Sequence, residues 1–200
     1  MRLTIELRKA IYMRHPSLRP LGLGAALLVA LGLPAVTAAA HAAASPSLAV
    51  AGCRTAQLTV APDRLANGAT NGDAGVGNLA LMYRLHNRSA QACTLYGYPG
   101  IQLLDANRRP LPTRLTWSRS AYLFNSPPAR LVRLNPGGDA FFALGWNHVA
   151  SAPANRPCPR VPYMLVTPPN ERTSLLLRDG PDSCDGRLTA SPVQSARFSI

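Results

Sequence analysis

The stretch CTLYGYPGIQLLD at residues 93–105 constrains the fold more than any other part of this 200-residue chain. An apolar run suited to a β-strand opens at Cys93, breaks at Gly97-Tyr98-Pro99-Gly100 and resumes until Asp105. Proline cannot donate a hydrogen bond to a strand ladder, so it belongs at an edge or a bulge, and glycines beside it fit a bend. The stretch therefore predicts a bent β-strand that starts at a cysteine.

Alternating apolar residues predict further strands. Between Leu79 and His86, and again between Ala140 and Trp146, apolar residues recur at every second position, which is typical of antiparallel strands. We expect additional strands at 55–60, 163–167, 175–177 and 187–193, and loops at 61–75 and 110–129. Short strands at this spacing, with no capped helical period after the first 42 residues, predict an all-β, immunoglobulin-like antiparallel β-sandwich.

Four cysteines, Cys53, Cys93, Cys158 and Cys184, lie at spacings too long for C-x-x-C redox or zinc motifs. An even number of cysteines in an exported chain indicates disulfides. We expect Cys53–Cys93 and Cys158–Cys184, because these pairs close loops that are local in sequence. Each bond would stabilise the fold by about 3–4 kcal/mol in the chain-entropy account.

The first 42 residues have the order of a secretory signal peptide: basic residues, an apolar segment from Leu21 to Leu33, and an Ala-His-Ala site. The apolar segment is shorter than the roughly 20 residues of a membrane-spanning helix. Two alternatives remain open. The leader is an uncleaved anchor, or the protein is a lipoprotein anchored at Cys53, since Val50-Ala51-Gly52-Cys53 matches a lipobox.

The expected organisation follows from that leader. We predict a signal peptide over residues 1–42, a short flexible tail over 43–52, a single β-sandwich domain over 53–195 and a C-terminal tail over 196–200. We expect no transmembrane span in the mature chain, and a secreted, periplasmic or cell-envelope location.

The charged residues of the chain limit the classes of binding partner that it suits. Without the leader the chain keeps 16 arginines, no lysine and eight acidic residues, a net charge of +8. The arginines are scattered, with only Arg108 and Arg109 adjacent, and no aromatic residues alternate with them as a stacking platform. The composition argues against nucleic acid and is compatible with an anionic envelope surface.

Candidate catalytic and metal-binding residues are few. Outside the leader the histidines are His86 and His148, and the only glutamate is Glu171. Hydrolysis needs a nucleophile, a base and an orienting group, and glycosidases need two facing carboxylates. The aspartates between 179 and 185 lack the spacing of a calcium loop. We expect no catalytic residue, no cofactor and no metal site.

The loop at 110–129 carries the residues that we predict as ligand contacts: Trp117, Tyr122, Arg114 and Arg119. Long irregular loops often hold binding residues. The aromatic rings would stack on a cell-wall polymer, and the arginines would suit an acidic envelope partner.

Several strings of the sequence occur together in one known family. They are Cys53 with Ala56-Gln57-Leu58, Cys93-Thr94-Leu95 with Gly97-Tyr98-Pro99-Gly100, Leu134-Asn135-Pro136-Gly137, and a later strand that ends at Pro168-Pro169. In these strings the chain resembles the bacterial secreted family catalogued as domain of unknown function 4232 (DUF4232), over roughly residues 53–195. The resemblance implies an exported β-sandwich with paired cysteines and no assigned activity, so no catalytic residue is carried over.

The leading hypothesis is an exported, non-enzymatic binding or interaction module at the cell envelope or outside the cell. Two alternatives belong to other classes. One is an envelope hydrolase that uses His148 or His86 in an unrecognised site, and the other is a lipid-anchored structural surface protein.

Overall fold

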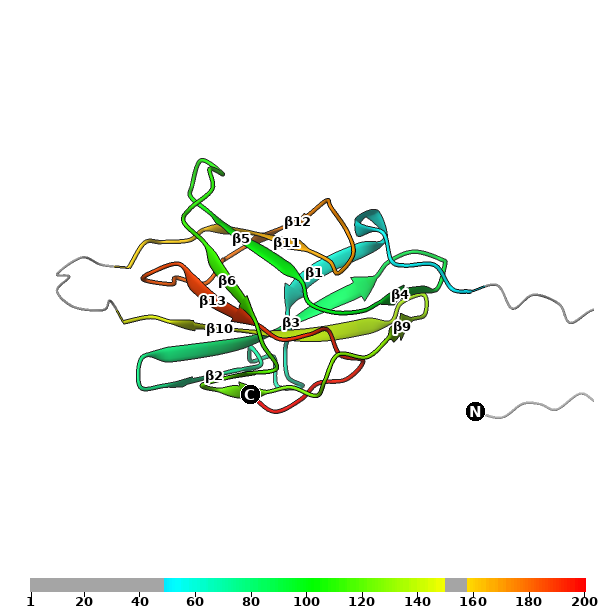
Figure 1. The fold of residues 1–200 in the computed structure, drawn as a ribbon, viewed down its shortest axis with the longest axis horizontal. Helices are drawn as coiled ribbons and strands as arrows, with labels where there is room; N and C mark the ends of the chain where they lie inside the picture. The colour runs from blue at the N-terminus through cyan, green and yellow to red at the C-terminus, as the bar shows by residue number, and fades with distance from the viewer. Residues whose placement is uncertain (1–48, 150–157) are drawn as a thin grey trace, which may run out of the picture. The chain divides into compact units, whose positions relative to one another are not determined.

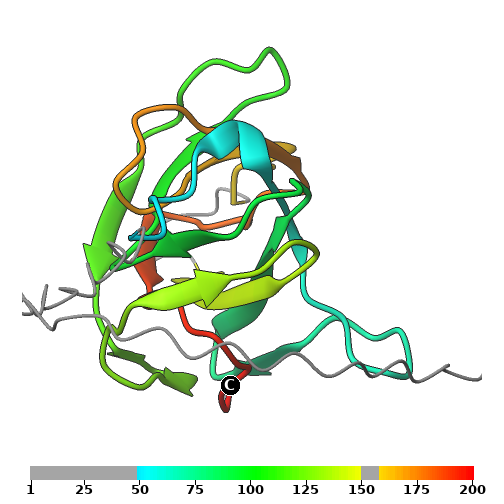
Figure 2. The same ribbon diagram turned by 90° about the vertical axis from the view of Figure 1, so that its right-hand side faces the viewer.

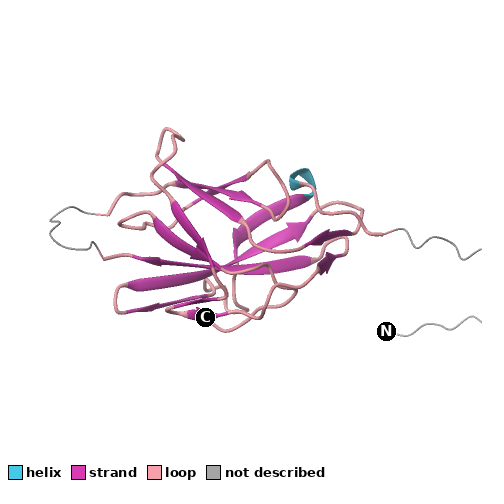
Figure 3. Cartoon of the chain, in the orientation of Figure 1, coloured by secondary structure: helices cyan, strands magenta, loops and turns pink. Residues whose placement is uncertain are grey.

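The computed structural model describes residues 49–149 and 158–200, so the predicted signal peptide over 1–42 lies outside the described residues. The described chain is all-β. It consists of strands, turns and loops, with one short 3-10 helix in the described ranges, η1 (Thr55–Gln57) (Figure 3). The all-β class expected from the alternating apolar pattern is confirmed.

The larger sheet has six strands, and the β3–β10 pair forms its middle. In spatial order its strands are β1 (Leu58–Pro62), β3 (Asn78–Asn87), β10 (Asp139–Asn147), β13 (Arg187–Ala190) and β6 (Arg114–Trp117), and β2 (Gly72–Gly75) joins β3 on the same edge as β1. Neighbouring strands are antiparallel except β13 and β6, which are parallel (Figure 1).

A smaller sheet faces the larger one across a shared hydrophobic core. It contains β12 (Leu175–Arg178), β11 (Tyr163–Thr167) and β5 (Gly100–Leu104), all antiparallel. Tyr83 and Phe142 come to the core from the larger sheet, where they are cross-strand partners with rings stacked at 5.4 Å, and Met164 and Val166 come from the smaller sheet. Burial of one such side chain contributes about 1.5–3 kcal/mol, so this core is the main attraction between the sheets.

The predicted bend at residues 97–100 lies where the chain passes from one sheet to another. β4 (Cys93–Leu95) pairs with β9 (Val132–Leu134) in a two-stranded sheet, whereas β5 pairs with β11. Gly97 has a φ of 105°, which glycine adopts far more readily than other residues. The bent strand expected from the sequence is therefore two strands joined by this turn.

Strand β10 is buried on both faces, because a second layer covers the side of the sheet that points away from the shared core. This layer contains a hairpin of β7 (Ser120–Ala121) and β8 (Phe124–Asn125) and the C-terminal residues. Phe124 packs there with Ala80 and Ala143, and Phe198 and Ile200 pack against the same cluster. Figures 1 and 2 show the C-terminus beside the hairpin.

Both disulfides join the cysteines that the sequence analysis paired: Cys53–Cys93 and Cys158–Cys184. Cys53 is 3% exposed and Cys93 1%, and both belong to the shared core. Cys158 and Cys184 are partly exposed. Of the predicted tail, the structure describes residues 49–52, and Gly52 forms a bridge with Thr94 beside the buried disulfide.

Two stretches predicted as loops contain strands. Residues 110–129 include β6, β7 and β8, and residues 61–75 include β2. These strands are four residues or shorter, and β2 reads GDAG, so no alternation of apolar residues marks them. β6 and β2 form because β13 and β3 offer edges on which a short backbone segment can pair, whereas β7 and β8 pair with each other as a hairpin. Such tertiary context outweighs strand propensity. The first predicted strand also begins later, at Leu58, because residues 55–57 form η1.

Candidate functional site

A hollow of about 500 Å³ lies on the outer face of the six-stranded sheet, under the β7–β8 hairpin. We call it the outer hollow. Strands β3, β6, β10 and β13 and the hairpin all contribute to its lining. The polar residues that line it include Arg114, Arg187, Thr116, Thr189, Asn147 and Tyr122.

Strand register explains why these residues meet. In the parallel β6–β13 pair, Arg187 lies opposite Arg114 and Thr189 lies opposite Thr116. Residues two apart on a strand point to the same face. One face of the pair therefore carries two arginines followed by two threonines, and Gly145 of β10 continues the threonine row as the partner of Thr189.

The two arginines give the outer hollow a positive charge. Arg187 Nε lies 3.3 Å from Asp185 Oδ2, in an ion pair that is open to solvent. Arg114 has no carboxylate partner among the described residues, and no carboxylate lines the outer hollow. Like charges directly opposite each other on neighbouring strands repel. An anion between the two guanidinium groups would relieve that repulsion.

The β7–β8 hairpin forms the wall of the outer hollow. Tyr122 lies at its tip and is 66% exposed. A Cβ atom at position 145 would lie 3.1 Å from Phe124 Cε1 and 3.4 Å from Ala121 Cβ, so glycine at this position lets the hairpin approach the sheet closely. At the base of the hairpin, Arg119 Nε donates a hydrogen bond to the carbonyl oxygen of Ser126.

The structure separates the four predicted ligand contacts. Arg114 and Tyr122 both line the outer hollow, whereas Arg119 supports the hairpin from its base. Trp117 lies three residues beyond Arg114 and faces the other side of β6. Its ring stacks on Tyr98 with 6.0 Å between centroids, and its Nε1–H donates to the carbonyl oxygen of Pro99. Trp117 and Arg114 therefore do not share one binding surface.

Sequence reasoning missed the residues that β13 brings to the outer hollow. Arg187 and Thr189 are separated from Arg114 by more than 70 residues. Their spacing of two indicates a shared strand face. No local pattern indicates that this face adjoins β6, because the parallel pairing is a long-range contact.

His86 and Asp139 form a second polar pair on the outer face of the sheet. They are cross-strand partners, with 2.8 Å between His86 Nδ1 and Asp139 Oδ1, and Arg84 Nη1 lies 3.4 Å from Asp139 Oδ2. Thr59 lies opposite His86 on β1. A histidine oriented by a carboxylate is part of a hydrolytic triad. In the described structure, however, the Thr59 hydroxyl makes no hydrogen bond to the His86 ring.

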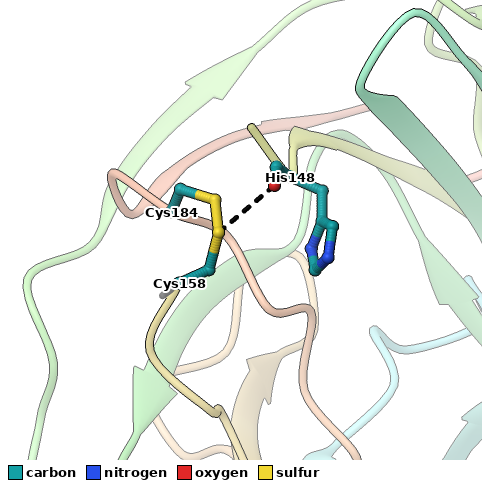
Figure 4. A group of neighbouring side chains, drawn as sticks. All are labelled: His148, Cys158 and Cys184. Carbon is teal, nitrogen blue, oxygen red and sulfur yellow. Dashed lines mark hydrogen bonds between the residues drawn. A yellow bond between two sulfur atoms is a disulfide. The ribbon is translucent and has the colours of Figure 1, made fainter. Parts of the chain in front are cut away.

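His148 lies beside the exposed disulfide, at the end of β10 (Figure 4). A ring nitrogen of His148 and the sulfur atoms of Cys158 and Cys184 lie within 4.8 Å of one another. Cys158 Sγ is also 3.2 Å from the carbonyl oxygen of His148. The Nδ1 atom of His148 lies 2.9 Å from the carbonyl oxygen of Asp182. The sequence suggested no metal ligands here, since the three residues match no ligand spacing.

Comparison with known proteins identifies a family without a described activity. The family model described as "Domain of unknown function (DUF4232)" matches residues 53–194. No curated protein and no solved structure matches the chain. Within residues 49–149 and 158–200, no helix is long and apolar enough to cross a membrane.

Proposed function

We propose that this chain, which belongs to the DUF4232 family of domains of unknown function, is an exported, non-enzymatic binding module that holds an anionic ligand in the outer hollow. Its two disulfides fit an oxidising compartment, outside the cell or in the envelope. We also propose that its two sheets form an immunoglobulin-like sandwich, with the β7–β8 hairpin and the C-terminal residues added to one face.

One observation carries the proposal: Arg114 and Arg187 are register partners on parallel strands, in a hollow that no carboxylate of residues 49–149 and 158–200 lines. Arginine presents planar, bidentate donors to carboxylate and phosphate groups. Thr116, Thr189 and Asn147 add hydroxyl and amide groups beside them. Tyr122 offers an exposed ring at the rim, suited to stacking on a sugar. The ligand class that fits is a polymer of sugars that bear carboxylate or phosphate groups.

Binding experiments with defined oligomers test this proposal. A hexuronic acid oligosaccharide, a glycerol phosphate oligomer and a neutral glucan of similar length would each be titrated into ¹⁵N-labelled protein. We expect at least one anionic oligomer to shift the amides of β6, β13 and residues 121–123, with an affinity that falls as salt is added. The neutral glucan should leave these amides unchanged.

Matched arginine variants complete that test. R114A and R187A should each weaken binding by roughly 10- to 150-fold, because one charge-assisted hydrogen bond contributes on the order of 1.5–3 kcal/mol. R133A is the control, because it removes the same charge from an exposed position on β9, outside the outer hollow. This variant should bind the anionic oligomer with the affinity of the unmodified protein. Equal losses in all three variants would indicate attraction by net charge alone and would contradict an ordered site.

A second candidate function is hydrolysis, which the hydrogen-bonded His86–Asp139 pair supports. If the protein were a hydrolase of this kind, purified protein would cleave an activated ester and H86A would abolish the turnover. We favour the binding module because the Thr59 hydroxyl makes no hydrogen bond to the His86 ring in the described structure.

The third candidate is a lipid-anchored protein. Cys53 is bonded to Cys93, and one sulfur atom cannot carry both this bond and a thioether-linked lipid. The intact mass of the exported protein separates the two forms. A chain that starts between residues 43 and 45 and gains four hydrogens on reduction supports the soluble form, and a lipidated Cys53 contradicts it.

A further inference from the structure

We propose that reduction of the Cys158–Cys184 disulfide creates a zinc site from the two thiolates and the imidazole of His148. The inference is independent of the outer hollow. It rests on the cluster in Figure 4, where residues from three separate parts of the chain bring two sulfur atoms and a ring nitrogen together.

The geometry of the cluster fits a tetrahedral ion. The two sulfur atoms and one ring nitrogen of His148 lie within 4.8 Å of one another. Around tetrahedral zinc, with its usual bond lengths to sulfur and nitrogen, ligand atoms are separated by about 3.6–3.8 Å. Opening the S–S bond lets the two sulfur atoms move apart to that separation. Side-chain rotations are sufficient, because the backbone already brings the three residues together.

The hydrogen bond of His148 determines which ring nitrogen is free to bind a metal ion. A carbonyl oxygen only accepts hydrogen bonds, so the Nδ1 atom that faces Asp182 O at 2.9 Å carries the proton. The Nε2 atom then keeps its lone pair. Metal-bound histidines are oriented in the same way, by donating the other ring N–H to a carbonyl or a carboxylate. Asp182, two residues before Cys184, adds negative charge that favours a cation.

The chemistry requires a reductant, which we identify as a dithiol. The dithiol donates two electrons and two protons, the Cys158–Cys184 bond breaks, two thiols form, and the reductant becomes a disulfide. Zinc then displaces the two thiol protons to solvent, and a water molecule fills the fourth position. Thiolate and imidazole ligands favour Zn²⁺ over the hard cations Mg²⁺ and Ca²⁺.

The difference in burial between the two disulfides should make the reduction selective for Cys158–Cys184. Cys53 and Cys93 are 3% and 1% exposed inside the core, so a reductant does not reach them in the folded protein. Cys158 and Cys184 are partly exposed. Because thiol–disulfide exchange needs access to a sulfur atom, the pair beside His148 opens first.

The test uses the exported protein with both disulfides. Limited dithiothreitol treatment, followed by anaerobic removal of the reductant and alkylation of a sample, should label Cys158 and Cys184 and leave Cys53 and Cys93 unlabelled. The reduced protein should then bind one Co²⁺, with the sulfur-to-cobalt charge-transfer absorption and the intense visible bands of a tetrahedral site. One equivalent of Zn²⁺ should remove both signals. The oxidised protein should show neither.

The variant H148A identifies the imidazole as a ligand. It leaves both cysteines in place and removes a direct ligand, so it should weaken Zn²⁺ binding at least as much as the roughly 10–100-fold that the loss of an outer partner costs. The double variant C158S/C184S should lose the cobalt signals. The proposal is overturned if the reduced protein shows no thiolate–cobalt absorption, if H148A binds Zn²⁺ as tightly as the unmodified protein, or if Cys53–Cys93 is reduced first.

Discussion

The guanidinium of Arg197 holds the carboxylate of Asp63 with two hydrogen bonds, from Nε to Oδ2 at 2.6 Å and from Nη2 to Oδ1 at 2.9 Å, across 134 residues of chain. The Asp63 side chain is only 1% exposed. The same guanidinium lies over the ring of Phe141, 4.9 Å from its centroid. This pair ties the C-terminal residues to the end of β1 and thereby supports the layer that carries the β7–β8 hairpin.

Removal of Arg197 should destabilise the fold. In R197A the buried Asp63 carboxylate loses its charged partner, which should lower the free energy of unfolding by on the order of 2 kcal/mol. The measurement is urea denaturation at neutral pH. R187A breaks the exposed ion pair with Asp185 and is the control, since exposed pairs contribute about 0–1 kcal/mol. Equal effects in the two variants would show that burial of Asp63 does not matter.

Low pH should lower the free energy of unfolding, because two carboxylates have lowered pKa values in the folded protein. Burial raises the pKa of Asp63, but hydrogen bonds from Arg197 and Asn71 and the charge of Arg197 outweigh it, so the net pKa is lowered. The backbone N–H and hydroxyl of Thr55 lower the pKa of Glu171. A lowered folded-state pKa stabilises the fold above the unfolded-state value, near 4, and this stability is lost as pH falls through the folded-state pKa.

We therefore expect the free energy of unfolding to decline as pH falls below about 4, where the unfolded chain takes up protons first. Denaturation at a series of pH values measures this slope. The double variant D63N/E171Q should show a shallower slope, and an unchanged slope would contradict the assignment to these two groups.

The buried disulfide should contribute more to the free energy of unfolding than the partly exposed one. C53A/C93A removes a crosslink between residues 40 apart, and C158A/C184A removes one between residues 26 apart. Chain entropy predicts losses of about 3–4 kcal/mol for each. The first variant also leaves a gap in the core, so its unfolding midpoint in urea should be the lower one. A lower midpoint for C158A/C184A would contradict this ranking.

The hydroxyl of Tyr83 should contribute nothing to stability. Its ring is fully buried, its oxygen has no hydrogen-bond partner among the described residues, and burial raises its pKa, which keeps the hydroxyl neutral. Replacing an unpaired polar group by an apolar group of the same shape is neutral or favourable. Y83F should therefore match the unmodified protein or gain about 1 kcal/mol in denaturant unfolding. A loss of stability would reveal a partner for the hydroxyl.

Larger residues at position 145 should displace the hairpin that forms the wall of the outer hollow. G145V places methyl groups against Phe124 and Ala121, and overpacking of this kind costs about 1–3 kcal/mol. We expect it to weaken binding of the anionic oligomer as well, because Tyr122 moves with the hairpin. G145A adds a single methyl group and should have a smaller effect on both measurements. A G145V protein with normal stability and binding would contradict this role.

Parts of the fold with strong local patterns could be predicted from the sequence. Strands at 79–86 and 140–146 and the bend at Gly97 follow from alternation and from backbone geometry. The predicted pairing of each cysteine with the nearer one along the chain, Cys53 with Cys93 and Cys158 with Cys184, is also confirmed. Of the four predicted contact residues, Arg114 and Tyr122 line the outer hollow, and their role in binding stays a prediction. The prediction did not include Arg187, and it grouped Trp117 with Arg114, which faces the other side of β6.

The sequence by itself determined the strand class and the turn positions, because each depends on neighbouring residues through side-chain alternation or allowed φ values. It favoured the observed disulfide pairing, because those two pairs close the loops most local in sequence. Only the tertiary structure decided that Arg187 lies beside Arg114, that Arg197 reaches Asp63, and that His148 meets Cys158 and Cys184. These contacts join segments that no local pattern relates. These long-range contacts depend on which strands pair with one another. Strand pairing in turn depends on burial and hydrogen bonding over the whole fold.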